Sequence, residues 1–134
     1  MNFVSRLFFV IVFFGWFQSC KKEEISETAQ SAILETLQPV PYITKYNSLK
    51  STATMVDVRT MSEFNAGHRS EALNIDINMM DFDTKAKQVL DIKKPVFVYC
   101  QSGVRSMNAA NRLKTLGYLV LYNLDGGFSD IKNL

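Results

Sequence analysis

The residues best suited to chemistry are Cys100 and the short polar loop that follows it. Cys100 comes directly after an apolar run at residues 96–99, whose β-favouring side chains predict a buried parallel strand ending at the C-terminal edge of a sheet. Gly103 is free to adopt a positive φ, and the residues after it have a helical pattern. Because backbone N–H groups gather at the positive end of a helix, this position and Arg105 should both favour a thiolate. The pattern therefore predicts a nucleophilic cysteine.

Length and composition indicate one modest globular domain around this loop. The chain has 134 residues, of which 47% are hydrophobic, and this is enough for a single core. A formal net charge of +2 is too small to suggest a nucleic-acid partner. With one histidine and no Cys-x-x-Cys pair, a zinc cluster and thioredoxin-type redox chemistry are both disfavoured. We therefore expect no metal site.

Strands alternate with helices along most of the chain. Strands are predicted at residues 53–58, 72–77, 95–99 and 118–122, and helices at 43–49, 60–67, 83–92 and 105–116. Thr60 and Glu63 form a capping-box pattern at the start of the second helix, and Gly67 ends that helix. This alternation predicts an α/β fold with a parallel sheet, and it places the cysteine loop at the C-terminal edge of the strands.

The segment before this domain is predicted to be a tether over residues 20–41, with the domain itself at 42–134. The tether is polar at its start, and Pro39 and Pro41 are expected to block continued helix. Ile33, Leu34 and Leu37 have helical spacing, which predicts a short amphipathic helix at 31–38 that covers the side of the domain.

The first 19 residues have the features of a signal peptide. Arg6 precedes an apolar run at residues 7–17, which is shorter than the about 20 residues that a membrane span needs. No alanine that could mark a soluble-protein cleavage site occurs before Ala29, whereas Ser19 precedes Cys20 as in a bacterial lipoprotein lipobox. We expect Cys20 to carry lipid and to anchor the protein in the bacterial cell envelope, outside the cytoplasm. The alternative is an ordinary cysteine behind a signal peptide.

If Cys20 is acylated, Cys100 is the only thiol left in the mature protein. No intramolecular disulfide can then form, although the compartment would permit one.

Several short motifs, in order and spacing, resemble the single-domain rhodanese family of sulfurtransferases over roughly residues 43–131. The motifs are Asp57-Val58-Arg59, Glu63-Phe64, Gly67-His68, Ala72-Leu73-Asn74-Ile75, the loop from Tyr99 to Ser106, and Leu124-Asp125-Gly126-Gly127. The resemblance implies a central parallel sheet with helices on both faces. Arg69, Glu71 and Ile131 depart from the family pattern, which commonly has an aliphatic residue, a glycine and a tryptophan there.

The resemblance also implies a two-step covalent mechanism. Cys100 would take the outer sulfur of a small anionic donor such as thiosulfate, and the resulting persulfide would pass it to a thiol, a protein acceptor or cyanide, without a cofactor. The N–H groups of the binding loop would stabilise the persulfide anion, while Arg105 would attract the donor and help to hold the loop closed. The residues of this loop are Gln101, Ser102, Gly103, Val104 and Ser106, and Ser106 could also donate to the sulfur.

Of two other functions, one is disfavoured by the length of the loop and one remains open. Cysteine phosphatases hold phosphate in a loop one residue longer than the four residues between Cys100 and Arg105, so phosphatase activity is disfavoured. A rhodanese-like domain can also be a non-catalytic persulfide carrier or docking module, and retention of Cys100 does not separate a carrier from a catalyst.

The remaining polar residues of the motifs have structural interpretations. Arg59 is expected to pair with Glu63 or with a backbone carbonyl beneath the loop, and Asp57 to be structural. His68 is expected to be a hydrogen-bonded supporting residue rather than a general base, and Asp125 to shape its turn.

Overall fold

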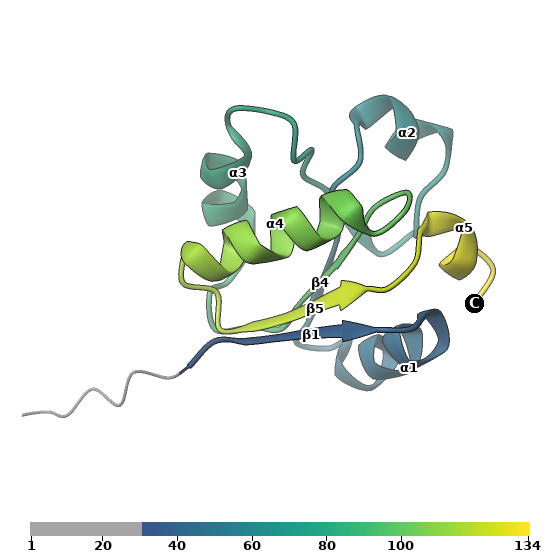
Figure 1. Cartoon of the computed structure of the whole chain (residues 1–134), viewed down its shortest axis with the longest axis horizontal. Helices are drawn as coiled ribbons and strands as arrows, with labels where there is room; N and C mark the ends of the chain where they lie inside the picture. The colour runs from purple at the N-terminus through teal and green to yellow at the C-terminus, as the bar shows by residue number, and fades with distance from the viewer. Residues whose placement is uncertain (1–30) are drawn as a thin grey trace, which may run out of the picture.

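A five-stranded parallel sheet forms the centre of the computed structural model, which describes residues 31–134 (Figure 1). The strand order is β1-β5-β4-β2-β3, and every neighbouring pair is parallel. The strands are β1 (Ile33–Leu37), β2 (Thr54–Asp57), β3 (Ala72–Asn74), β4 (Val96–Tyr99) and β5 (Val120–Leu124). The predicted α/β fold with a parallel sheet is therefore confirmed.

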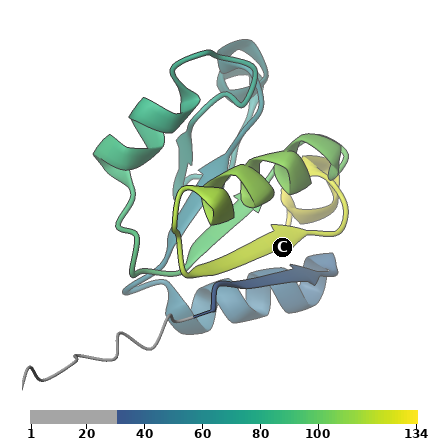
Figure 2. The same cartoon turned by 60° about the vertical axis from the view of Figure 1, so that its left-hand side comes forward.

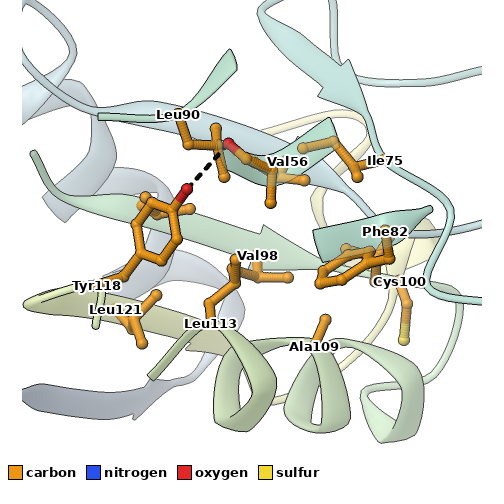
Figure 3. Packing of buried hydrophobic residues seen from close by; sticks show 13 residues of the cluster. Val56, Ile75, Phe82, Leu90, Val98, Cys100, Ala109, Leu113, Tyr118 and Leu121 are labelled. Carbon is orange, nitrogen blue, oxygen red and sulfur yellow. Dashed lines mark hydrogen bonds between the residues drawn. The ribbon is translucent and has the colours of Figure 1, made fainter. Parts of the chain in front are cut away.

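Helices cover both faces of the sheet, as Figures 1 and 2 show, with α3 and α4 on one side and α1 on the other. The helices are α1 (Pro39–Leu49), α2 (Met61–Ala66), α3 (Phe82–Val89), α4 (Val104–Thr115) and α5 (Phe128–Ile131). Successive side chains of a strand point to opposite faces, so β4 contributes Val98 to one core and Phe97 to the other. One core packs beneath α3 and α4 and is drawn in Figure 3, and the other packs against α1 and α5.

The prediction for residues 31–38 is wrong, because Ile33–Leu37 is the edge strand β1 rather than a helix. It pairs in parallel with β5, from Ile33 opposite Val120 to Leu37 opposite Leu124. This pairing joins segments far apart in sequence, and it overrides the local helical spacing of three apolar residues.

The predicted tether also ends too late in the chain. Helix α1 begins at Pro39, and both Pro39 and Pro41 lie in its first turn. Proline is tolerated there because the first N–H groups of a helix have no partner within the helix. The folded part therefore includes β1 and the start of α1, which both precede the predicted boundary at Tyr42.

The predicted signal peptide at 1–19, Cys20 and the first part of the tether lie outside the described residues. Between residues 31 and 134, no helix is long and apolar enough to cross a membrane. The same part of the chain has no group of three or more His, Cys, Asp or Glu side chains placed to bind a metal ion.

Candidate active site

Cys100 lies immediately after β4, where the chain leaves the centre of the sheet at its C-terminal edge. Its side chain is fully buried, and Figure 3 shows the sulfur pointing from the strand toward the beginning of α4. The loop turns at Gly103, which has a φ of +90°, a value that side-chain-bearing residues rarely adopt. Its N–H then donates to Sγ of Cys100 at 3.1 Å. The loop geometry thus directs main-chain donors at the sulfur.

The surroundings of Cys100 favour its charged form. Burial raises the pKa of the thiol, but the hydroxyl of Ser106 and the N–H groups of Ser102, Ser106 and Gly103 outweigh burial, and the pKa is lowered. The net effect has the direction expected of a cysteine at a helix N-terminus. Arg105 is not among the main causes of the lowered pKa of Cys100, because the hydrogen bonds from the loop itself lower it most.

Arg105 forms a bidentate ion pair with Glu63 of α2. Its two terminal nitrogens each donate to one carboxylate oxygen of Glu63 at 2.7 Å. The capping box is also present, since Glu63 accepts from the Thr60 N–H at 3.0 Å and donates its own N–H to Thr60 Oγ1 at 3.2 Å. The Arg105 hydrogen bond, against some desolvation and aided by Thr60, lowers the pKa of Glu63 to about 2. Glu63 therefore caps α2 and binds the loop arginine.

Arg59 is buried beneath the loop, and its main partner is Asp57. Its guanidinium donates to Asp57 at 2.6 and 3.0 Å, and also to the Gly67 carbonyl at 2.7 Å. A further nitrogen donates to the side-chain oxygen of Gln101 at 3.3 Å. Of the two partners predicted for Arg59, a backbone carbonyl is confirmed and is that of Gly67, whereas Glu63 is wrong.

The turn before α5 forms the floor of the loop. The Phe128 N–H donates to the Cys100 carbonyl at 2.9 Å, and a Cβ placed on Gly127 would lie 1.8 Å from the Gln101 carbonyl oxygen. Asp125 stabilises the same turn by donating its N–H to the Leu37 carbonyl at 2.7 Å. The loop backbone consequently rests directly on this turn.

The predicted loop residues lie together, but they differ in exposure. Ser106 is buried beside Cys100, and its hydroxyl is 3.0 Å from the Gly103 carbonyl oxygen. Gln101, Ser102 and Val104 are exposed on the outside of the loop. The Gln101 side-chain oxygen nevertheless accepts from Arg59, and Ser102 contributes its backbone N–H to the Cys100 sulfur.

His68 lies on the surface beyond the end of α2. Its Nδ1 is 2.8 Å from the Phe64 carbonyl oxygen, and its ring stacks on the Phe64 ring with centroids 3.6 Å apart. These contacts agree with a supporting role.

The three departures from the family pattern are neighbours in the fold. Arg69 forms an ion pair with Glu71 at 2.6 Å, and another of its nitrogens donates to the carbonyls of Ile131 and Leu134 at 3.0 Å each. Ile131 itself is fully buried. Arg69 therefore holds the end of α5 by hydrogen bonds.

Replacing Ser106 with alanine should raise the pKa of the Cys100 thiol, because the largest contribution that lowers it is lost while burial remains. A hydrogen bond to a charged group contributes about 1.5–3 kcal/mol, so the rate of Cys100 modification at neutral pH should fall about tenfold or more. The rate should recover as the pH rises through the new pKa and the thiolate forms. A titration of thiolate absorbance in both proteins, with Cys100→Ser as the blank, measures the shift; an unchanged titration would contradict it.

Comparisons with known proteins agree with this fold. The family described as "Rhodanese-like domain" matches residues 44–134. The chain is 36% identical over 99 residues to "Uncharacterized protein YqhL" of Bacillus subtilis, covering 74% of this chain and 73% of that protein. It is 40% identical over 76 residues to "Thiosulfate sulfurtransferase GlpE" of Shewanella oneidensis, covering 56% of this chain and 71% of that protein.

Solved structures give the same result. A rhodanese-like domain from Anabaena superposes with a TM-score of 0.65 at 23% identity, with 73% of each chain covered, and this similarity concerns the fold. The Escherichia coli structure titled "rhodanese with anions" is 32% identical, with a TM-score of 0.51 over 59% of this chain and 91% of that one. The chain therefore belongs to the rhodanese-like domain family.

Proposed function

We propose that this protein is a sulfurtransferase that moves sulfane sulfur from a donor such as thiosulfate to a thiol or cyanide acceptor through a persulfide on Cys100. The observation that carries the proposal is the ring of loop donors around a cysteine whose thiol pKa is lowered. The names of relatives such as the Shewanella protein add support from the same family.

The first step is attack of the Cys100 thiolate on the outer sulfur of thiosulfate. The new bond joins Sγ to that sulfur, the bond between the two sulfurs of thiosulfate breaks, and sulfite leaves with the electron pair. The resulting persulfide anion replaces the thiolate among the same N–H donors, of which the Gly103 N–H is 3.1 Å from Sγ. Because the Cys100 side chain is fully buried, donor entry requires the side chains around it to move.

The second step is attack of an acceptor nucleophile on the terminal sulfur. The bond between Sγ and this sulfur breaks, Cys100 leaves as the thiolate, and the hydrogen bonds that lower its pKa make it a better leaving group. Both steps balance without a cofactor, and none is proposed.

The test is mass spectrometry of the purified domain after exposure to thiosulfate. We expect Cys100 to gain one sulfur atom, cyanide to remove it as thiocyanate, and Cys100→Ser to remain unmodified. Phosphatase turnover in the absence of any persulfide would overturn the proposal.

The second candidate function is a persulfide carrier, because the loop donors that lower the pKa of Cys100 would also stabilise a long-lived persulfide anion. A carrier would form the same persulfide but would release it only to a partner protein. Steady turnover with a small thiol would therefore favour the catalyst, and a persulfide that is stable to small thiols would favour the carrier.

We also propose that Cys20 is lipidated and anchors the protein in the cell envelope, as its lipobox-like position suggests. Metabolic labelling with a fatty acid in a bacterial host tests this. Wild-type protein should be labelled and sediment with membranes, whereas Cys20→Ala should be unlabelled.

A further inference from the structure

The guanidinium of Arg105, at the end of the active loop, is already paired with a carboxylate. Arg105 donates both of its terminal nitrogens to Glu63, and the side chains of this pair are 28% and 31% exposed. The pKa of Arg105 is raised chiefly by the Glu63 hydrogen bond, with further contributions from Cys100 and Asp76. The positive charge of Arg105 is therefore balanced against Glu63, Asp76 and the Cys100 thiolate, which are all negative.

Arg59, the second arginine at the loop, adds no unpaired positive charge. Arg59 is 3% exposed and is paired with Asp57, which is fully buried. Without Glu63, an approaching anion would meet an unpaired guanidinium; with Glu63, a donor that carries two negative charges has to share or displace a carboxylate. The arrangement penalises a dianion far more than a donor with one charge or none.

Apolar side chains line a hollow beside the active loop. Val104 is 67% exposed, and it lines this hollow together with Met107 and Leu124. Such side chains offer contact to the carbon skeleton of an organic ligand and nothing to a small inorganic dianion.

From these observations we infer that the preferred donor is an organic hydropersulfide with at most one negative charge, and that Glu63 sets this preference by occupying Arg105. The inference rests on the proposed function. In the step, the Cys100 thiolate bonds to the terminal sulfur of R–S–SH, the bond between the two donor sulfurs breaks, and R–S⁻ leaves. Charge and electrons balance, and Cys100 carries the sulfur and its proton.

Glu63→Gln is the informative variant, because glutamine is also accepted at this position of a capping box. It removes the charge while keeping one oxygen that can accept from Arg105. Glu35→Gln is the matched control, since Glu35 forms an ion pair with Lys45 at 2.6 Å on another part of the surface. Both variants change the net charge of the protein equally.

The experiment measures the rate of Cys100 persulfidation by thiosulfate and by the freshly generated hydropersulfide of N-acetylcysteine amide. Wild-type protein should react faster with the hydropersulfide, and its thiosulfate rate should rise with added inert salt because repulsion is screened. Glu63→Gln should raise the ratio of thiosulfate to hydropersulfide rates about tenfold, and Glu35→Gln should leave the ratio unchanged.

The outcomes separate this inference from the proposed function. If both donors form the persulfide and Glu63→Gln leaves the ratio unchanged or lowers it, the inference is overturned and the sulfurtransferase function stands. If neither donor modifies Cys100 in any variant, both are overturned.

Discussion

Adding one methyl group at position 127 should disable the cysteine loop. In Gly127→Ala, the new Cβ would lie 1.8 Å from the carbonyl oxygen of Gln101 and 2.6 Å from its carbon. Neither contact can persist, and both partners belong to the backbone, so relief requires the loop or the turn to move. The backbone of Gly127 has φ −132° and ψ 175°, which alanine adopts freely, so the expected cost is purely steric.

The expected loss of stability is at or above about 3 kcal/mol, the upper part of the range for overpacked sites. A shift of about 1 Å in a reacting group can cost about a hundredfold in rate, so Cys100 persulfidation should fall by at least that factor. Denaturant unfolding and mass-spectrometric persulfidation measure the two effects.

Gly117→Ala is the matched control for this substitution. Gly117 follows α4 with a φ of +95°, and its Cβ would meet only the end of the Ile92 side chain, at 3.2 Å. We expect a backbone cost of about 1–2 kcal/mol and an unchanged persulfidation rate in the folded protein. Near-wild-type behaviour of Gly127→Ala would mean that the loop does not rest on this turn.

The sequence predicted most of the sheet and the location of the cysteine, because those features depend on local patterns. The buried strand before Cys100 is a continuous apolar run, and the capping box at Thr60 and Glu63 is a pattern of four consecutive residues. The lowered pKa of Cys100 also follows from local structure, since its donors lie within six residues of the sulfur, from Ser102 to Ser106.

The features that the sequence did not predict depend on pairing between distant segments. Strand β1 is half exposed at the edge of the sheet, and its residues form a strand because β5 supplies hydrogen-bond partners. Glu63 was predicted to cap α2 or to pair with Arg59, whereas its ion pair with Arg105 joins residues 42 positions apart. Arg59 could equally have paired with Glu63 by spacing, and only the fold places Asp57 against its guanidinium.

The second large effect is expected at the buried ion pair below the loop. Asp57→Ala would leave the Arg59 guanidinium 3% exposed with only the Gly67 carbonyl and the more distant Gln101 oxygen as partners. Removing one partner of a buried ion pair costs about 3–5 kcal/mol, because the remaining charge is buried without compensation. If this variant does not fold, Asp57→Asn is measured in its place, because asparagine keeps one oxygen that can accept from Arg59 but carries no charge.

The comparison with an exposed pair separates burial from pairing as the cause. Glu35→Ala breaks the ion pair with Lys45, whose side chains are 43% and 35% exposed, and this should cost at most about 1 kcal/mol. A double variant, Asp57→Leu with Arg59→Met, should be more stable than Asp57→Ala because no charge remains buried, although Gly67 and Gln101 lose their donor. Denaturant unfolding of the four proteins measures these differences. Equal losses in Asp57→Ala and Glu35→Ala would contradict the argument, because burial would then contribute nothing to the energy of the pair.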